Sequence, residues 1–161
     1  MKTVVFVRHG KSSWSYNADD KDRPLKERGI NDAHLVAQEF KKRDKKLDFI
    51  YSSHAIRALH TAVIFVRNLS VGFKKFAISD RLYDFSGESV LNFLKGLPEA
   101  CDSVMVFGHN YAFTSLVNEL GDTYIDNVPT SGLTEIQFDV NQWSELKNGT
   151  TIETIFPKNL R

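Results

Sequence analysis

The sequence has almost no cysteine. Cys101 is the single cysteine in 161 residues, so the chain cannot form an intramolecular disulfide or a cysteine-based zinc cluster. This cysteine usage is typical of proteins in a reducing compartment, and we expect a cytoplasmic protein.

The sequence also lacks an excess of charge and a long hydrophobic run. Lys and Arg number 21 against 20 for Asp and Glu, which leaves a formal charge of +1. Such a chain has no global field that would hold nucleic acid or an anionic membrane, so we expect neither partner and predict that any anion site is local. The longest apolar start, Val4 to Val7, ends at Arg8 and is far shorter than the roughly 20 residues that span a bilayer. That start therefore predicts a strand.

What remains is the composition of a soluble globular protein. Hydrophobic residues make up 42% of the chain and charged residues 25%, which excludes a disordered, collagen-like or coiled-coil chain. The length is close to the roughly 150 residues of one common domain. We expect residues 1–161 to form a single domain.

Short apolar runs alternate with helical patterns along the chain. The runs predict buried strands, weakest at the third: residues 3–7, 47–51, 75–78 and 103–107. Apolar side chains recur at helical spacing after them, in residues 30–40, 90–97 and 113–120. Residues 134–140 alternate apolar with polar side chains, which predicts a half-buried strand that residues 152–156 could join. The sum is a three-layer α/β/α sandwich with a mainly parallel sheet.

Unusual polar residues follow three of these strands. They are Arg8-His9-Gly10, Ser52-Ser53-His54-Ala55-Ile56-Arg57 and Gly108-His109-Asn110. Ligands of open α/β sheets bind beyond the carboxyl ends of the strands, so two histidines and two arginines are predicted to converge there.

Several features of these segments favour an anion. Gly10 and Gly108 permit close approach of backbone to a ligand, and Ser53 and Asn110 are good helix N-caps. Each guanidinium can bind two phosphate oxygens at once. A metal ion is the competing interpretation of the histidines, but it would be repelled by the neighbouring arginines. We therefore expect a phosphate site with no metal and no cofactor.

These segments resemble a known family. Arg8-His9-Gly10 after the first strand, the string Ser53-x-Ala55-x-Arg57-Ala58-x-x-Thr61-Ala62, and Gly108-His109-Asn110 resemble the histidine phosphatase superfamily, also called phosphoglycerate-mutase-like. Further similarity to the SixA-type phosphohistidine phosphatases lies in Arg8-His9-Gly10-Lys11-Ser12-Ser13-Trp14, Asp22-Arg23-Pro24-Leu25, Leu82-Tyr83-Asp84 and Pro129-Thr130. The resemblance covers about residues 3–140.

The resemblance implies a role for each residue of the site. His9 would be the nucleophile that becomes phosphorylated, and Arg8, Arg57 and His109 would complete the phosphate pocket. Asn110 and Arg23 would contact the substrate, although Arg23 could instead simply precede the turn at Pro24.

A proton donor for the leaving group is expected after the third strand. Asp84 stands at the position where many relatives carry Glu, and it could equally be a residue that caps a loop. Glu88, on the following helix, is a rival for the role.

The resemblance implies a metal-independent phosphatase that acts on phosphohistidine of a protein through a phosphohistidine intermediate at His9. A chain this short leaves little room for segments that cover the site, which favours a protein substrate. A small-molecule phosphatase or a mutase is one alternative, and a non-catalytic phosphate-binding module is another.

Overall fold

The computed structural model describes all 161 residues and contains one six-stranded sheet. The strands are β1 (Lys2–Arg8), β2 (Phe49–Ser52), β3 (Phe76–Ile78), β4 (Ser103–Gly108), β5 (Leu133–Phe138) and β6 (Thr150–Ile155). Their order is β3-β2-β4-β1-β5-β6. The first four run parallel, whereas β5 is antiparallel to β1 and β6 is antiparallel to β5. The predicted mainly parallel sheet is confirmed.

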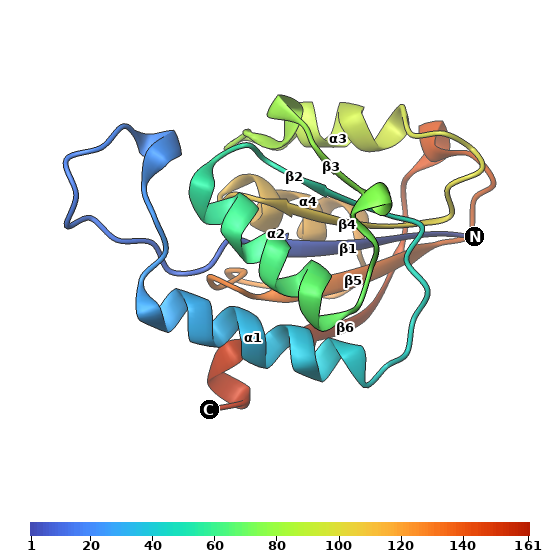
Figure 1. Ribbon diagram of the computed structural model, residues 1–161. Helices are drawn as coiled ribbons and strands as arrows, with labels where there is room; N and C mark the ends of the chain where they lie inside the picture. Colours follow the sequence, from blue (N-terminus) through green and yellow to red (C-terminus); the bar gives the residue numbers. More distant parts are fainter.

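Helices cover both faces of this sheet (Figure 1). They are α1 (Glu27–Lys41), α2 (Ile56–Asn68), α3 (Glu88–Lys95) and α4 (Ala112–Leu120). Side chains alternate between the faces of a strand, so Val5 and Val7 of β1 pack with α1 and α2 while Val4 and Phe6 pack with α3 and α4. Two apolar cores therefore enclose the sheet, and the predicted α/β/α sandwich is confirmed.

Two strand predictions need correction. β2 begins at Phe49 rather than at Leu47, because its pairing with β4 starts at Phe49, opposite Val104. The Asp48 carboxylate just before it accepts hydrogen bonds from the amides of Asp102 and Ser103. β5 is covered on both faces rather than one, since Glu135 is 3% exposed and its carboxylate binds the Lys45 ammonium at 2.6 Å. An ion pair thus replaces the solvent that the alternating pattern predicts.

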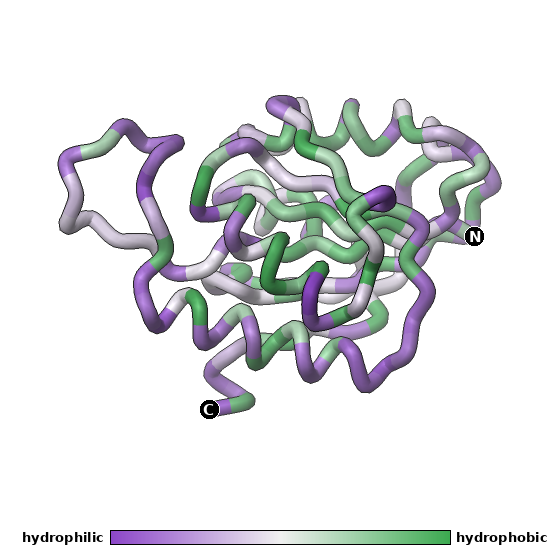
Figure 2. Tube along the Cα trace, viewed as in Figure 1, coloured by the Kyte–Doolittle hydropathy of each residue, from purple (hydrophilic) through white to green (hydrophobic).

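A loop between β1 and α1 projects from the carboxyl end of the sheet (Figure 1). At its base the Ser13 amide donates to the Pro24 carbonyl and the Lys26 amide to the Lys11 carbonyl, both at 2.8 Å. Residues 14–22 beyond that base are exposed and mostly hydrophilic (Figure 2). The loop therefore owes little of its position to a core of its own.

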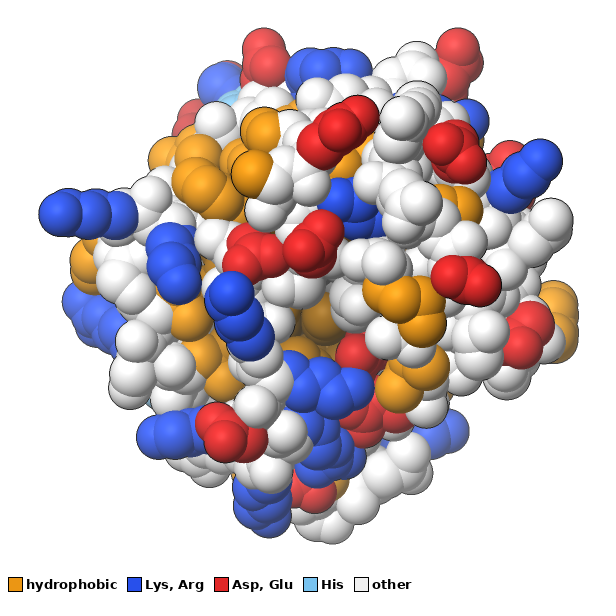
Figure 3. All heavy atoms as spheres, turned by 90° about the vertical axis from the view of Figure 1, so that its right-hand side faces the viewer, with side chains coloured by type: hydrophobic (Ala, Val, Ile, Leu, Met, Phe, Trp, Pro, Cys, Tyr) orange, Lys and Arg blue, Asp and Glu red, His pale blue; other side chains and the backbone are white.

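The face at the opposite end of the sheet carries both signs of charge. Figure 3 shows acidic and basic side chains interspersed over it, as the nearly neutral composition leads us to expect. None of the helices combines the length and the apolar character that a membrane crossing requires.

Candidate active site

Parallel pairing of β1 with β4 brings the two histidine segments together. Arg8 lies opposite Gly108 in the register, and the His9 amide donates to the Gly108 carbonyl at 3.0 Å. The rings of His9 and His109 follow directly, with centroids 5.3 Å apart. The predicted convergence at the carboxyl edge therefore occurs.

Gly108 is required at this edge by close packing. A Cβ atom on it would come within 2.7 Å of the Phe113 ring, and one on Gly10 would come within 2.9 Å of the Gly29 carbonyl oxygen. Neither distance is compatible with a side chain, so larger residues here would displace the segments that carry the histidines.

His9 is held with one ring nitrogen available for chemistry. Its Nδ1 lies 2.7 Å from the Gly10 carbonyl oxygen, which can only accept, so Nδ1 carries the proton and Nε2 keeps its lone pair. Burial lowers the pKa of His9 to about 3. The hydrogen bond to Gly10 raises this pKa, whereas the charges of Arg57 and Arg8 lower it further. His9 is therefore neutral near pH 7, as a nucleophile must be.

Ser53 holds His109 in the same tautomer as His9, but through the other ring nitrogen. The Ser53 hydroxyl oxygen accepts from the Ala55 amide at 3.2 Å and lies 2.9 Å from Nε2 of His109. Because this buried hydroxyl has no other acceptor, its proton points to that nitrogen. Nδ1 of His109 then carries a proton, and it is buried with no partner. Burial, with the nearby His9, lowers the pKa of His109 to about 2. This side chain thus offers a neutral N–H donor.

The first turn of α2 delivers Arg57. Ala58 and Ala62 are completely buried, and such small side chains let the helix lie close to the sheet. Thr61 ties the helix to the loop after β1, because its hydroxyl accepts from the Gly10 amide at 2.9 Å and donates to the Arg57 carbonyl at 2.7 Å. Arg57 is fixed beside His9 as a result.

Three arginines line a pocket of about 320 Å³ together with His9. Nε of Arg8, Nε of Arg57, and both Nε and Nη1 of Arg23 are buried with no hydrogen-bond partner. Unpaired buried donors are costly, so their gathering around one pocket marks the place of an anion. Arg23 lies in the lining and not merely before a turn, with its guanidinium stacked on the exposed Trp14 ring.

The structure departs from both predicted helix caps. Ser53 is not an N-cap, because Ala55 holds that position and the Ser53 hydroxyl serves His109. Asn110 stands one residue before the N-cap of α4, yet its side-chain Oδ1 still accepts from the Thr114 amide. Asn110 lines the pocket, but its Nδ2 donates to Asn127.

Asp84 and Glu88 lie outside this pocket, in a separate surface depression. The Asp84 carboxylate accepts from the amides of Ser86, Gly87 and Val90. Burial raises the pKa of Asp84, but these hydrogen bonds outweigh it and lower the pKa overall. Asp84 thus binds amides at the start of α3, whose N-cap is Gly87, and is in an ionised state unsuited to donating a proton.

Two residues at the pocket had no role predicted from the sequence, Asp20 and Tyr83. Asp20 is the one carboxyl residue in the pocket lining, and Tyr83 donates to its Oδ2 at 2.6 Å. The sequence feature that could have pointed to Asp20 is the acidic stretch Asp19-Asp20-Lys21-Asp22, directly before Arg23. Which of its carboxylates faces the arginines depends on how the loop folds back.

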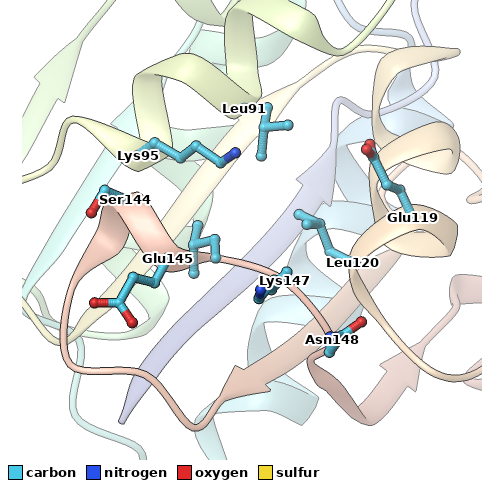
Figure 4. A pocket seen from close by; sticks show the side chains of 9 residues that line it. Leu91, Lys95, Glu119, Leu120, Ser144, Glu145, Lys147 and Asn148 are labelled. Atoms are coloured by element: carbon cyan, nitrogen blue, oxygen red, sulfur yellow. The ribbon is translucent and has the colours of Figure 1, made fainter.

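A second hollow, of about 450 Å³, lies between α3, α4 and the loop before β6 (Figure 4). Its basic residues Lys95 and Lys147 are accompanied by Glu119 and Glu145. It holds no histidine or arginine, so the chemistry described above belongs to the pocket at the carboxyl edge.

Comparisons with known proteins identify the family of the chain. The family model described as "Histidine phosphatase superfamily (branch 1)" matches residues 4–89, more than half of the chain. The chain belongs to the histidine phosphatase superfamily. Its fold is the phosphoglycerate-mutase-like α/β fold of SixA, and the family resemblance inferred from the sequence is confirmed.

Two solved structures align along nearly the whole chain. The protein histidine phosphatase SixA complexed with tungstate is 25% identical, with a TM-score of 0.84 and 99% of each chain covered. A candidate phosphohistidine phosphatase SixA from Agrobacterium tumefaciens is also 25% identical, with a TM-score of 0.80 and coverage of 96% of this chain and 97% of that one. Both similarities support a phosphatase.

A curated relative matches over a shorter segment. The 2,3-bisphosphoglycerate-dependent phosphoglycerate mutase of Gloeothece citriformis (strain PCC 7424) is 35% identical over 69 residues, which are 40% of this chain. That segment spans 29% of the length of the mutase.

Proposed function

We propose that this protein is a metal-independent phosphatase that removes the phosphoryl group from phosphohistidine on a protein, through a covalent intermediate at His9. The observation that supports this proposal most strongly is the unprotonated Nε2 of His9 beside three arginines, each of which keeps at least one buried N–H group without a hydrogen-bond partner. Arginine N–H groups suit the equatorial oxygens of a phosphoryl group in transfer, and the partnerless Nδ1–H of His109 suits one more.

The reaction takes two displacements at phosphorus. In the first, the lone pair of His9 Nε2 forms a P–N bond while the P–N bond of the substrate breaks and its electron pair returns to the substrate imidazole. In the second, water forms a P–O bond, the bond to Nε2 breaks, and inorganic phosphate leaves. Arg8, Arg23 and Arg57 neutralise the phosphoryl oxygens in both steps.

The acid groups of the pocket favour phosphohistidine over an alkyl phosphoester. An alkoxide needs a proton as it leaves, and a positioned general acid contributes roughly 10²- to 10⁴-fold. Asp20, the carboxyl residue of the pocket, is engaged by Arg57 and Tyr83, which outweigh its burial and lower its pKa. An imidazole needs less help, since its conjugate acid has a pKa of about 6.5 and its far nitrogen can take a proton from water.

The rim of the pocket favours a protein as the carrier of the phosphoryl group. Trp14 and Phe85 line the pocket and are 76% and 45% exposed. Tyr111, beside the pocket residue Asn110, is 57% exposed. Exposed aromatic side chains of this kind are enriched where proteins bind one another.

The test is turnover in excess chelator on three substrates. They are a protein carrying phosphohistidine, p-nitrophenyl phosphate and a phosphoserine peptide. We expect kcat/KM to fall in that order, and we expect His9→Ala to abolish all three activities while His60→Ala, an exposed histidine of α2, retains them.

A preference for the phosphoserine peptide would favour the small-ester alternative. Phosphate binding without turnover would favour the non-catalytic module.

A further inference from the structure

The carboxylate of Asp20 sits where a phosphoryl group would be expected. Nη2 of Arg57 donates to Oδ2 of Asp20 at 2.9 Å, and Nη1 donates to the backbone carbonyl of the same residue at 2.6 Å. Both terminal nitrogens of this guanidinium, the pair that would bind two phosphate oxygens, are therefore occupied. Only Nε of Arg57 is left without a partner.

Other groups reinforce this position of Asp20. The Tyr83 hydroxyl donates to Oδ2 at 2.6 Å, and Nε of Arg23 lies 3.5 Å from Oδ1. A carboxylate so surrounded stays ionised, and a phosphoryl group of about two negative charges would be repelled at the same guanidinium. One guanidinium edge cannot serve both anions.

Asp20 is also what holds the loop to the rest of the fold. The side-chain and backbone hydrogen bonds that join residues 14–22 to α2 and to Tyr83 all involve Asp20. The other hydrogen bonds of this segment stay near the loop, such as that from the Ala18 amide to the Tyr16 carbonyl. Exchange of Asp20 for another anion would therefore release the loop from α2.

We propose that Asp20 is an internal competitor of the substrate phosphate, and that phosphate entry displaces its carboxylate from Arg57 and frees the loop of residues 14–22. This inference rests on the proposed phosphate site and adds the regulation of that site. The Asp20 carboxylate lowers the affinity of the pocket for any phosphate, and it does so more strongly the larger the fraction of molecules in which it occupies Arg57. It disfavours free inorganic phosphate, whereas a substrate held also through its protein surface can still displace it.

The experiment measures the Kd of inorganic phosphate by calorimetry in the wild type and four variants. We expect Asp20→Ala to bind phosphate about tenfold more tightly, because both terminal nitrogens of Arg57 are free before phosphate binds. Tyr83→Phe, which removes one of the groups holding Asp20, should tighten binding by a smaller factor. Asp22→Asn removes an equal charge from the same loop, where Asp22 faces only Lys21, and should leave Kd within twofold of the wild type. Arg57→Ala should abolish most of the binding.

Tryptophan fluorescence tests the movement of the loop. Trp14 is exposed and stacks on Arg23. The second tryptophan, Trp143, is buried, and its indole N–H donates a hydrogen bond to the Cys101 carbonyl. Phosphate should change the emission of the wild type, and Asp20→Ala should show the changed emission before phosphate is added. Trp14→Phe should remove this response.

Two failures can be told apart. Equal or weaker phosphate binding by Asp20→Ala, with binding still lost in Arg57→Ala, would overturn the competitor and leave the phosphate site intact; Asp20 would then be a residue that positions Arg57. No binding by wild type or Asp20→Ala would overturn the proposed function together with this inference.

Discussion

The proposed mechanism requires two neutral histidines beside a cationic pocket, with His9 in its lining and His109 buried behind it. Burial lowers the pKa of both rings. Both rings carry their proton on Nδ1, but in His9 the Gly10 carbonyl accepts that proton and leaves Nε2 free, whereas in His109 the Ser53 hydroxyl occupies Nε2 and leaves Nδ1–H without a partner. One ring therefore offers a lone pair and the other offers an N–H group. Two identical residue types acquire different roles from their immediate partners.

The low pKa of the histidines predicts how stability depends on pH. Their folded values of about 3 and about 2 lie below the unfolded value of about 6.5. Between these limits the unfolded chain binds more protons than the folded chain, so the free energy of unfolding falls as pH falls from about 6.5 toward 3. The histidine contribution is fully present above about pH 6.5.

His109→Gln should flatten this dependence. We expect the wild type to lose roughly 1–3 kcal/mol more than the variant between pH 7.5 and 4.5, measured by urea unfolding. His34→Gln, at an exposed position of α1, is the control and should follow the wild type. Parallel curves for wild type and His109→Gln would show that His109 is not held neutral.

Arg57→Lys tests the planar geometry of the guanidinium. An ammonium keeps the charge but cannot bind two phosphate oxygens in one plane, so kcat/KM should fall at least tenfold, about 1.4 kcal/mol of transition-state stabilisation. Arg67→Lys, in the last turn of the same helix, is the matched control. Wild-type kinetics for Arg57→Lys would place its guanidinium outside the reacting centre.

At the scale of elements, the site is a set of strand ends and helix starts. Direct pairing of β1 with β4 brings the two histidines together. The connection from β2 to α2 supplies Ser53, and the first turn of α2 supplies Arg57. Asp84 stabilises an element, because its carboxylate accepts hydrogen bonds from the Gly87 and Val90 amides at the start of α3. Its contribution is to hold a helix rather than to touch the pocket.

Asp84→Asn should therefore lower the stability of the protein more than its activity. An amide has one acceptor oxygen in place of two, so we expect the free energy of unfolding to fall by about 1–2 kcal/mol. Turnover of phosphohistidine should change little. Glu88→Gln is the control, at an exposed position in the first turn of α3. A selective loss of phosphoserine hydrolysis in Asp84→Asn at unchanged stability would instead make Asp84 the proton donor.

At the scale of the whole molecule, the sequence predicts what parallel strands bring together. The segments after β1, β2 and β4 had to meet at one edge, since the carboxyl ends of parallel strands lie side by side. The position of Asp20 could not be derived in this way, because it depends on where a long exposed loop folds back onto α2. The burial of Glu135 escaped prediction for a related reason, as its partner Lys45 is 90 residues away in the sequence.

The identity of the phosphorylated atom tests the proposed covalent mechanism most directly. The protein would be mixed briefly with a protein carrying labelled phosphohistidine, quenched in alkali, digested, and examined by mass spectrometry and phosphorus NMR. We predict acid-labile phosphate on the peptide containing His9, attached at Nε2 and absent from His9→Ala. Label at Nδ1, label on another residue, or turnover without any labelled protein would contradict a covalent intermediate at Nε2 of His9.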